Sequence, residues 1–479
     1  MTDTHTMTQT IAPEFLVRAK TLLGPVGFID TPADMENYLS DWRGRGNGEA
    51  PFIARPESVV QVSEFMALCA EYGVAVTPQG GNTGLVLGGL PHGEVLLSTK
   101  RLRAVRNIDP LNDSVTVEAG IILAELQEIV AKENRLFPLS LGAEGQAQIG
   151  GLISTNAGGV AVLKYGMMRD LVLGLEVVMP DGRIWNGLTG LRKDNTAYDL
   201  KQLFIGAEGT LGVITAATLK MMPRPAVKMV SWLCVESPAK AVELLALAKA
   251  ETGGAVSSFE LMPRIGVDFV LEQMPDTRDP HPDAKSPWYV LMEISFPREE
   301  GARDVLEGLL EKAMESEIVT DGVLAESETQ AFEIWKIRET LPLAEKAFGK
   351  AVKHDVSVPV SSLPAFIEQA NARVYAIVPN ANIISFGHVG DGNMHYNVAP
   401  PEGVSDDEFY KAYGAELTKA VHDLVCDMNG SISAEHGIGT MKRDELAERV
   451  SDVEMDMLKA VKRALDPENR MNPNRVISI

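Results

Sequence analysis

Residues 77–89 of the chain have the sequence TPQGGNTGLVLGG and continue the short β-branched run VAVT at residues 74–77. Glycine permits backbone conformations that other residues avoid, so successive N–H groups of such a loop can converge on one anion. A pyrophosphate group is an anion of this kind. A tight turn at the edge of a sheet would explain a single loop of this type equally well.

Two further loops of the same kind follow, GAEGQAQIGGLISTNAGG at 142–159 and FIGAEGTLGVIT at 204–215. Three such loops exceed what turns alone require, and this favours a bound phosphate-containing group. The chain lacks a GxGxxG motif in the required frame after a strand, and it lacks GxxxxGK[ST]. Both absences disfavour a Rossmann dinucleotide site and a P-loop.

The size and charge of the chain limit the kind of protein it can be and the partners it can bind. With 479 residues, of which 45% are hydrophobic, it is too long for one hydrophobic core and predicts two or more domains. Its formal net charge of -22 repels phosphate backbones and anionic lipid headgroups, so nucleic acid and membrane surfaces are not expected partners. Short apolar runs interleaved with helical stretches predict an α+β or mixed α/β protein.

The cysteines and the N-terminus indicate a reducing compartment. Cys69, Cys234 and Cys426 stand far apart without a CxxC pair, which fits neither a disulfide framework nor a thiolate zinc site. The opening MTDTHTMTQT lacks the basic and apolar regions of a secretory signal peptide. No run approaches the roughly 20 apolar residues of a membrane span. We therefore expect a cytoplasmic protein.

The second half of the chain predicts a separate domain. After KMMPRPAVK (220–228), the strand-like MVSWLCVE precedes the helical PAKAVELLALAKAE, and WYVLMEISF precedes REEGARDVLEGLLEKAMES in the same way. This is an approximate internal repeat. The last 50 residues are again loop and helix, and we expect them to pack back on the first domain.

The stretch FGHVGDGNMHYNV at 386–398 predicts a hairpin that carries a metal site. Its strands are NIISF and MHYNV, and His395 and Asn397, two residues apart, face the same side. His388 ends the first strand, and SAEHGIG supplies Glu435 as a third ligand. Two imidazoles and a carboxylate make an open site typical of zinc and compatible with manganese or iron. Alternatively, His388 caps the hairpin and His395 sits in a core.

Five motifs occur in order along the chain: PQGGNTGLVLGG, QIGGLISTNAGG, GAEGTLGVIT, FGHVGDGNMHYNV and SAEHGIG. Together they resemble the FAD-dependent D-2-hydroxyacid dehydrogenases of the vanillyl-alcohol oxidase type flavoprotein superfamily, over nearly the whole chain. GNMHYN is more similar to D-2-hydroxyglutarate dehydrogenases than to D-lactate dehydrogenases or glycolate oxidase subunits. The resemblance implies an α+β, two-subdomain FAD-binding fold (1–222), a substrate domain on an antiparallel sheet with flanking helices (223–430), and a C-terminal segment (431–479) returning to the FAD domain.

The resemblance also implies which residues bind FAD. The expected residues are Pro78, Gln79, Gly80, Gly81, Asn82, Thr83, Gly84, Pro138, Gly142, Gly151, Asn156, Gly158, Gly159, Gly209, Ile214 and Pro473. Some relatives attach FAD covalently through a histidine or cysteine. Residues 79–89 contain neither, so we expect non-covalent FAD.

For the metal and substrate, the resemblance implies that His388, His395 and Glu435 bind a divalent cation. His436, beside Glu435, is the candidate general base because its ordinary pKa suits neutral pH; a role in orienting the flavin is the alternative. Arg338, Lys353 and Asn397 would hold the substrate, the arginine by a bidentate pair with a carboxylate.

One position departs from the family pattern. Relatives that act on D-2-hydroxyglutarate carry a threonine four residues after the arginine, where this chain has Pro342, with Thr340 two residues earlier. This departure leaves the identity of the substrate acid open, although we prefer a dicarboxylic acid.

The expected reaction is oxidation of D-2-hydroxyglutarate or a similar D-2-hydroxyacid, with electrons passed to an electron-transfer flavoprotein or a quinone. A D-lactate dehydrogenase or a glycolate oxidase subunit is the first alternative, and a metal-dependent hydrolase is a more remote one. A homodimer is compatible with the sequence.

Overall fold

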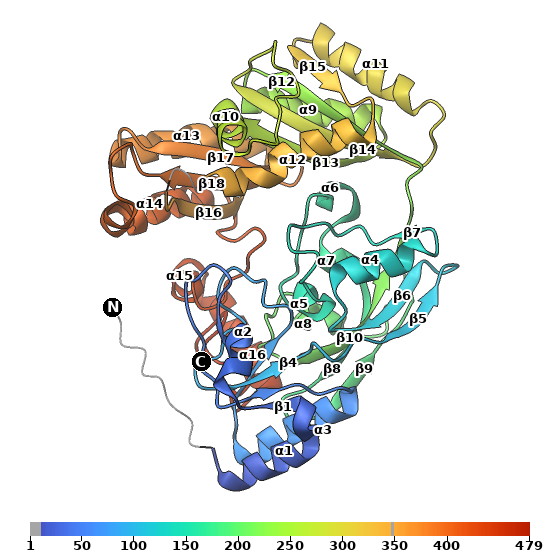
Figure 1. The fold of residues 1–479 in the computed structure, drawn as a ribbon, viewed down its shortest axis with the longest axis vertical. Helices are drawn as coiled ribbons and strands as arrows, with labels where there is room; N and C mark the ends of the chain where they lie inside the picture. Colours follow the sequence, from blue (N-terminus) through green and yellow to red (C-terminus); the bar gives the residue numbers. More distant parts are fainter. Residues whose placement is uncertain (1–10, 346–348) are drawn as a thin grey trace. The chain divides into compact units, whose positions relative to one another are not determined.

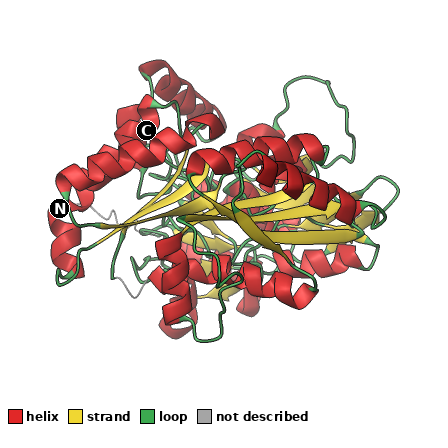
Figure 2. Cartoon of the chain, turned by 90° about the horizontal axis from the view of Figure 1, so that it is seen from above, coloured by secondary structure: helices red, strands yellow, loops and turns green. Residues whose placement is uncertain are grey.

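The computed structural model describes residues 11–345 and 349–479 and contains helices and strands throughout (Figure 2). It divides into two compact units. The first comprises residues 1–158, 167–223 and 435–479, and the second comprises 159–166 and 224–434. The expected α+β class is confirmed.

A four-stranded sheet opens the first unit, in the order β1-β2-β4-β3. Strands β2, β3 and β4 are parallel, so their carboxyl ends share one edge. The loop that begins at Gly80 leaves from this edge, at the end of β3. The elements are α1 (Pro13–Gly27), β1 (Phe28–Ile29), α2 (Pro32–Leu39), β2 (Ile53–Ala54), α3 (Val59–Tyr72), β3 (Val76–Gln79) and β4 (Val95–Ser98).

A five-stranded sheet follows in the order β5-β6-β10-β8-β9, with all its pairs antiparallel. Its apolar face packs on α4, α5 and α7 in one core. The elements are β5 (Val105–Asp109), β6 (Ser114–Glu118), α4 (Leu123–Ala131), β7 (Arg135–Leu136), α5 (Ile149–Ser154), α7 (Met168–Leu171), β8 (Val172–Val178), β9 (Ile184–Gly187), α8 (Lys201–Phe204), β10 (Val213–Lys220) and β11 (Met222–Pro223).

The C-terminal segment joins the first unit through buried charges. It contains α15 (Arg443–Arg449) and α16 (Asp452–Leu465). Lys462 Nζ donates to Asp466 Oδ2 at 2.5 Å, to Thr210 O at 2.7 Å and to Met471 O at 2.8 Å. Buried ammonium groups need such partners, because an unpaired charge in the interior is costly. These bonds fix the tail against the third glycine loop.

The second unit is built on one seven-stranded antiparallel sheet in the order β15-β12-β14-β13-β17-β18-β16. The elements are α6 (Val162–Tyr165), β12 (Val227–Val235), α9 (Pro238–Glu251), β13 (Val256–Pro263), α10 (Arg264–Gln273), β14 (Trp288–Phe296), α11 (Ala302–Glu315), β15 (Asp321–Leu324), α12 (Glu328–Ala344), β16 (Val352–Ser357), the 3₁₀ helix η2 (Val360–Ser362), α13 (Leu363–Ile377), β17 (Asn382–His388), β18 (Asn393–Ala399) and α14 (Asp406–Asp427).

The two faces of this sheet have different helical cover. Helices α9, α11, α13 and α14 share a core with one face. Helices α10 and α12 pack on the other face (Figure 1). Strand β18 alternates between them, with Met394, Tyr396 and Val398 in the first core. His395 pairs with Phe386, which belongs to the second core, so the histidine faces the α10 and α12 side.

Among the described helices, none has the length and apolar character needed to cross a bilayer.

Candidate active site

The three glycine loops pack against one another within the first unit. A Cβ added at Gly81 would lie 2.1 Å from Gln146 O, and one at Gly209 would lie 2.5 Å from Pro78 Cγ. A Cβ at Gly80 would lie 3.5 Å from Gly151 N. Loops that are far apart in sequence therefore meet, and at Gly81 and Gly209 the approach is too close for any residue with a Cβ.

The same loops leave part of their backbone approachable. An added Cβ at Gly84, Gly142 or Gly151 would have no heavy atom within 4 Å. Asn82, between Gly81 and Gly84, has a φ of 55°, a left-handed conformation of the kind that turns successive N–H groups toward one point. Converging, accessible glycine backbone fits a large anionic cofactor such as FAD.

Several of the expected FAD residues use their side chains to brace these loops. Gln79 Nε2 donates to Tyr38 O at 2.8 Å and to Gly89 O at 2.9 Å. Asn82 Nδ2 donates to Ser40 O at 2.9 Å. Asn156 Oδ1 accepts from the backbone N–H of Arg169 at 2.9 Å. Their backbone, rather than these amide groups, is left for a ligand.

The remaining expected FAD residues lie in varied surroundings. Thr83 is partly exposed, whereas Pro138, Gly158 and Gly159 are buried. Ile214 is 5% exposed in the core under the five-stranded sheet. Pro473 has no N–H to donate; beside it, Asn472 Nδ2 donates to Gly88 O at 3.0 Å and to Glu208 O at 2.7 Å.

Glu208 is a residue of the third glycine loop that the sequence analysis did not single out. Its carboxylate accepts from the backbone N–H groups of Ile438 at 2.7 Å and Gly439 at 2.8 Å. Burial raises the pKa of Glu208, and the two N–H groups oppose that rise. The bonds hold the segment that immediately follows His436.

Replacing Gly81 by alanine is expected to destabilise the first unit and weaken FAD binding. The new Cβ would overlap a backbone carbonyl oxygen, so the two loops must separate, at a cost of about 1–3 kcal/mol in the free energy of unfolding. Thermal unfolding and the flavin retained after gel filtration measure the two effects.

Gly84→Ala is the matched control for this loop, because its Cβ has no heavy atom within 4 Å. The free energy of unfolding of its apoprotein should stay within about 0.5 kcal/mol of the parent. Equal unfolding temperatures for the two variants would contradict the packing of the loops.

Three side chains expected to bind metal lie together. His388, His395 and Glu435 each offer one ligand atom, and these atoms lie within 4.8 Å of one another. Glu435 directly follows Ala434, the last residue of the second unit, whose N–H donates to Asp355 O at 3.2 Å. Two imidazoles and one carboxylate are a donor set that fits zinc and other divalent cations.

A buried glutamate orients one of these histidines. Glu260 on β13 accepts from His388 Nδ1 at 2.6 Å, which leaves Nε2 of His388 as the atom to bind metal. Its other oxygen accepts from Arg338 Nε at 2.7 Å. Burial would raise the pKa of Glu260, but the charges and hydrogen bonds of His388 and Arg338 outweigh it and lower it to about 2. Glu260 is therefore ionised at neutral pH.

Arg338 is buried on α12 rather than exposed. Its side chain is 7% exposed, and its guanidinium lies over the Phe386 ring, 4.9 Å from the centroid. The arginine is thus fixed by an ion pair and by an aromatic face before any substrate binds.

Lys353 and Asn397, expected to hold the substrate, are cross-strand neighbours on β16 and β18. A second buried glutamate joins them. Glu345 Oε2 accepts from Lys353 Nζ at 2.8 Å, and Glu345 Oε1 accepts from Asn397 Nδ2 at 2.7 Å. The next pair on this face is Asp355 with His395.

His436 falls into a second grouping with the same glutamate. Asp355, Glu435 and His436 offer ligand atoms within 4.8 Å of one another. Asp355 is buried and accepts from Asn393 Nδ2 at 2.9 Å. A carboxylate near the imidazole suits a proton acceptor, because it stabilises the imidazolium that forms.

Sequence reasoning missed Glu260, Asp355 and Glu345, although two of them left a signal. Glu260 interrupts the buried apolar strand VSSFELMP, and Asp355 follows Lys353 at the spacing of one strand face. Glu345 ends α12 without any such pattern.

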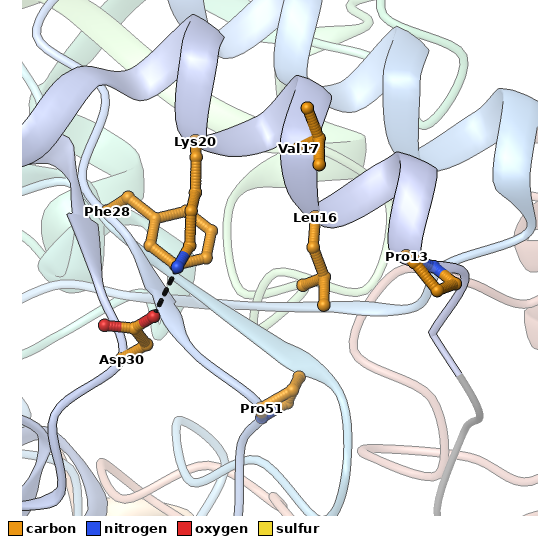
Figure 3. A pocket seen from close by; sticks show the side chains of 7 residues that line it. All are labelled: Pro13, Leu16, Val17, Lys20, Phe28, Asp30 and Pro51. Carbon is orange, nitrogen blue, oxygen red and sulfur yellow. Dashed lines mark hydrogen bonds and ion pairs between the residues drawn. The ribbon is translucent and has the colours of Figure 1, made fainter.

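A separate pocket lies beside α1 in the first unit (Figure 3). Lys20 Nζ and Asp30 Oδ2 form an ion pair at 2.7 Å in its wall. Its lining consists of Pro13, Leu16, Val17, Lys20, Phe28, Asp30 and Pro51. This lining contains none of the residues expected to bind FAD, metal or substrate.

Comparison with known families identifies both halves of the chain. The model of the C-terminal domain of FAD linked oxidases matches residues 224–476, and that of an FAD binding domain matches residues 50–187. The solved structure of p-cresol methylhydroxylase has a TM-score of 0.73 at 15% identity and covers 98% of each chain. At that identity the likeness concerns the fold alone.

Two relatives carry an activity in their names. The D-2-hydroxyglutarate dehydrogenase of Arabidopsis thaliana is 34% identical over 459 residues, or 96% of this chain and 80% of its own. The enzyme of the same name from Bos taurus is 35% identical over 455 residues, or 95% and 81%.

Both relatives are named as mitochondrial, so the expected cytoplasmic location is wrong. The polar N-terminus excluded only a secretory signal. A mitochondrial transit peptide has no long apolar region. The absence of the basic and apolar regions of a secretory signal therefore does not bear on whether a transit peptide is present.

The matches to flavoprotein families also argue against the metal-dependent hydrolase, for which the glycine loops would be only structural. The converging glycine loops of the first unit, the histidine-bearing sheet of the second unit and these matches lead to one conclusion: the chain belongs to the FAD-linked oxidase family and is an FAD-dependent oxidoreductase.

Proposed function

We propose that the protein oxidises D-2-hydroxyglutarate, or a closely similar D-2-hydroxyacid, to the 2-oxoacid with the help of a divalent cation. The relatives named above support the substrate class. The observation that supports the proposal most directly is that His388, His395 and Glu435 offer ligand atoms within 4.8 Å of one another. His395 also shares its sheet face with Asn397 and with Lys353, the cross-strand neighbour of Asn397. Donors for a cation and donors for a carboxylate occur there together.

The residues have separate tasks in the proposed reaction. His388 and His395, with Glu435, hold the cation, and Glu260 fixes the ring of His388 through its 2.6 Å bond. His436 accepts the proton of the substrate hydroxyl as general base. When bound, FAD would accept a hydride from C2 of the substrate, and the cation would lower the pKa of the hydroxyl.

Arg338, Lys353 and Asn397 bind and orient the acid in this proposal. Arg338 is fixed by its ion pair with Glu260, which reduces the entropy lost when it engages a carboxylate. FAD is held without a covalent bond by residues 78–84, because these loop residues include no histidine or cysteine. Electrons then pass to an electron-transfer flavoprotein or a quinone.

A panel of D- and L-2-hydroxyacids with an artificial electron acceptor tests the function. Purified protein should show flavin absorbance, released by acid precipitation as free FAD. It should oxidise D-2-hydroxyglutarate at least about a hundredfold faster than the L-enantiomer. When fixed donors hold the carboxylate and the hydroxyl, the single hydrogen at C2 points toward the flavin in only one of the two enantiomers.

A chelator should abolish turnover without removing FAD, and zinc, manganese or iron should restore it. Undiminished turnover after verified removal of all metal would exclude the role of the cation. Colourless protein that hydrolyses an ester or amide would exclude the oxidase itself.

A further inference from the structure

Glu345 occupies two of the three donors that the proposed function assigns to the substrate, Lys353 and Asn397. The residue is 2% exposed at the end of α12. One carboxylate oxygen lies 2.8 Å from Lys353 Nζ and 3.0 Å from Asn397 Nδ2, and the other lies 2.7 Å from the same amide nitrogen. The carboxylate is thus held by a charge-assisted bond and an amide at once.

Lys353 and Asn397, which Glu345 contacts, lie where the end of a substrate remote from its hydroxyl group would be expected. Lys353 pairs with Asn397, and Asp355 pairs with His395, so the two pairs lie two residues apart on the same face. Two residues of a strand span about 6.6 Å. A 2-hydroxyacid whose hydroxyl end lies at His395 would therefore reach Lys353 and Asn397 with a substituent several carbons away.

The two cationic side chains proposed to bind the substrate are already paired with carboxylates of the protein. Arg338 is paired with Glu260 at 2.7 Å and Lys353 with Glu345 at 2.8 Å. A second carboxylate on the substrate would meet a lysine whose charge Glu345 offsets, and would approach Glu345 itself. Two carboxylates that share a site repel each other, whereas an uncharged group meets no such penalty.

We propose that Glu345 is a specificity-determining residue that lowers the preference of the enzyme for dicarboxylic over uncharged-tail D-2-hydroxyacids, by competing with the second carboxylate for Lys353 and Asn397. This inference rests on the proposed function and adds the residue that sets its charge preference. The inference also relates to the departure from the family pattern at Pro342. Where the relatives carry a threonine this chain has Pro342, and the carboxylate of Glu345 follows three residues later.

The test compares D-2-hydroxyglutarate with its 5-amide, which has the same shape and one charge fewer. The ratio of kcat/KM for the diacid to that for the amide is measured with the FAD- and metal-loaded enzyme and an artificial acceptor. Glu345→Gln should raise this ratio by about tenfold to a hundredfold, mainly through KM of the diacid, as removal of a charge several ångströms away implies.

Three further variants make the result specific. Glu345→Asp keeps the charge and should retain a ratio near that of the parent. Lys353→Gln leaves Glu345 without its cation and should lower the ratio, in the opposite direction. Glu333→Gln removes an equal charge from an exposed position of α12 and should leave the ratio unchanged.

The proposal is overturned if Glu345→Gln stays within twofold of the parent ratio, or if Glu345→Asp matches Glu345→Gln. Should Glu345→Gln fail to fold by thermal unfolding, the fall expected for Lys353→Gln decides, and an unchanged or raised ratio there overturns the proposal. If the parent enzyme oxidises neither acid, the proposed function fails. The same ratio is then measured as dissociation constants by calorimetry, with the same expected directions.

Discussion

Alanine at position 395 is expected to remove the bound cation and to lower kcat/KM by about a thousandfold, while FAD stays bound. His395 supplies one of the three ligand atoms that lie within 4.8 Å of one another, and two remaining ligands hold a divalent ion poorly. Loss of a Lewis acid removes several kcal/mol of transition-state stabilisation, and each 1.36 kcal/mol is a factor of ten. Metal analysis, flavin absorbance and steady-state kinetics measure the three quantities.

His281→Ala is the matched control, since this histidine also belongs to the second unit but lies in a loop, 3.2 Å from Asp321 Oδ1. It should keep both metal and turnover. If His395→Ala retained stoichiometric metal and parental activity, the proposed metal site would be wrong. If it lost FAD together with the metal, FAD binding would depend on the metal site, although the residues expected to form the two sites lie far apart in the sequence.

The fold could be predicted where apolar runs are long and buried. The run WYVLMEISF matches β14, Trp288–Phe296, residue for residue, because nearly every side chain of that strand is buried. The hairpin strands were also located, as β17 and β18. Their place in the sheet was not predictable, because β13 pairs with β17 through Glu260 and His388, which are 128 residues apart. No local pattern encodes such a pairing.

The residues of the candidate site likewise fall into those that the sequence could place and those that it could not. The alternation of a strand put His395 and Asn397 on one side, and the register of β16 adds Lys353 beside the amide. The carboxylates that hold these groups were missed because their partners are distant in sequence. Glu345 meets Asn397 across 52 residues, and nothing in the helix LPLAE distinguishes it from a solvated glutamate.

Alanine in place of Glu260 is expected to destabilise the second unit by about 3–5 kcal/mol and to lower turnover at least a hundredfold. Glu260 is fully buried and accepts from both His388 Nδ1 and Arg338 Nε. Removing one member of a buried ion pair leaves the remaining charge without compensation, and Arg338 cannot reach water because it is 7% exposed. The ring of His388 also loses the bond that sets its tautomer, which weakens the metal site.

Denaturant unfolding and metal affinity measure these two effects, with Glu293→Ala on the neighbouring strand β14 as the control. Glu293 is also buried, but its cation Lys228 is 52% exposed and can return to water, so a cost of about 1 kcal/mol is expected. Glu260→Gln separates the two roles further: the amide oxygen can still accept one bond from His388, whereas Arg338 loses its counter-charge. It should therefore recover part of the metal affinity but little of the stability. Equal unfolding free energies for Glu260→Ala and Glu293→Ala would refute the importance assigned to this buried network.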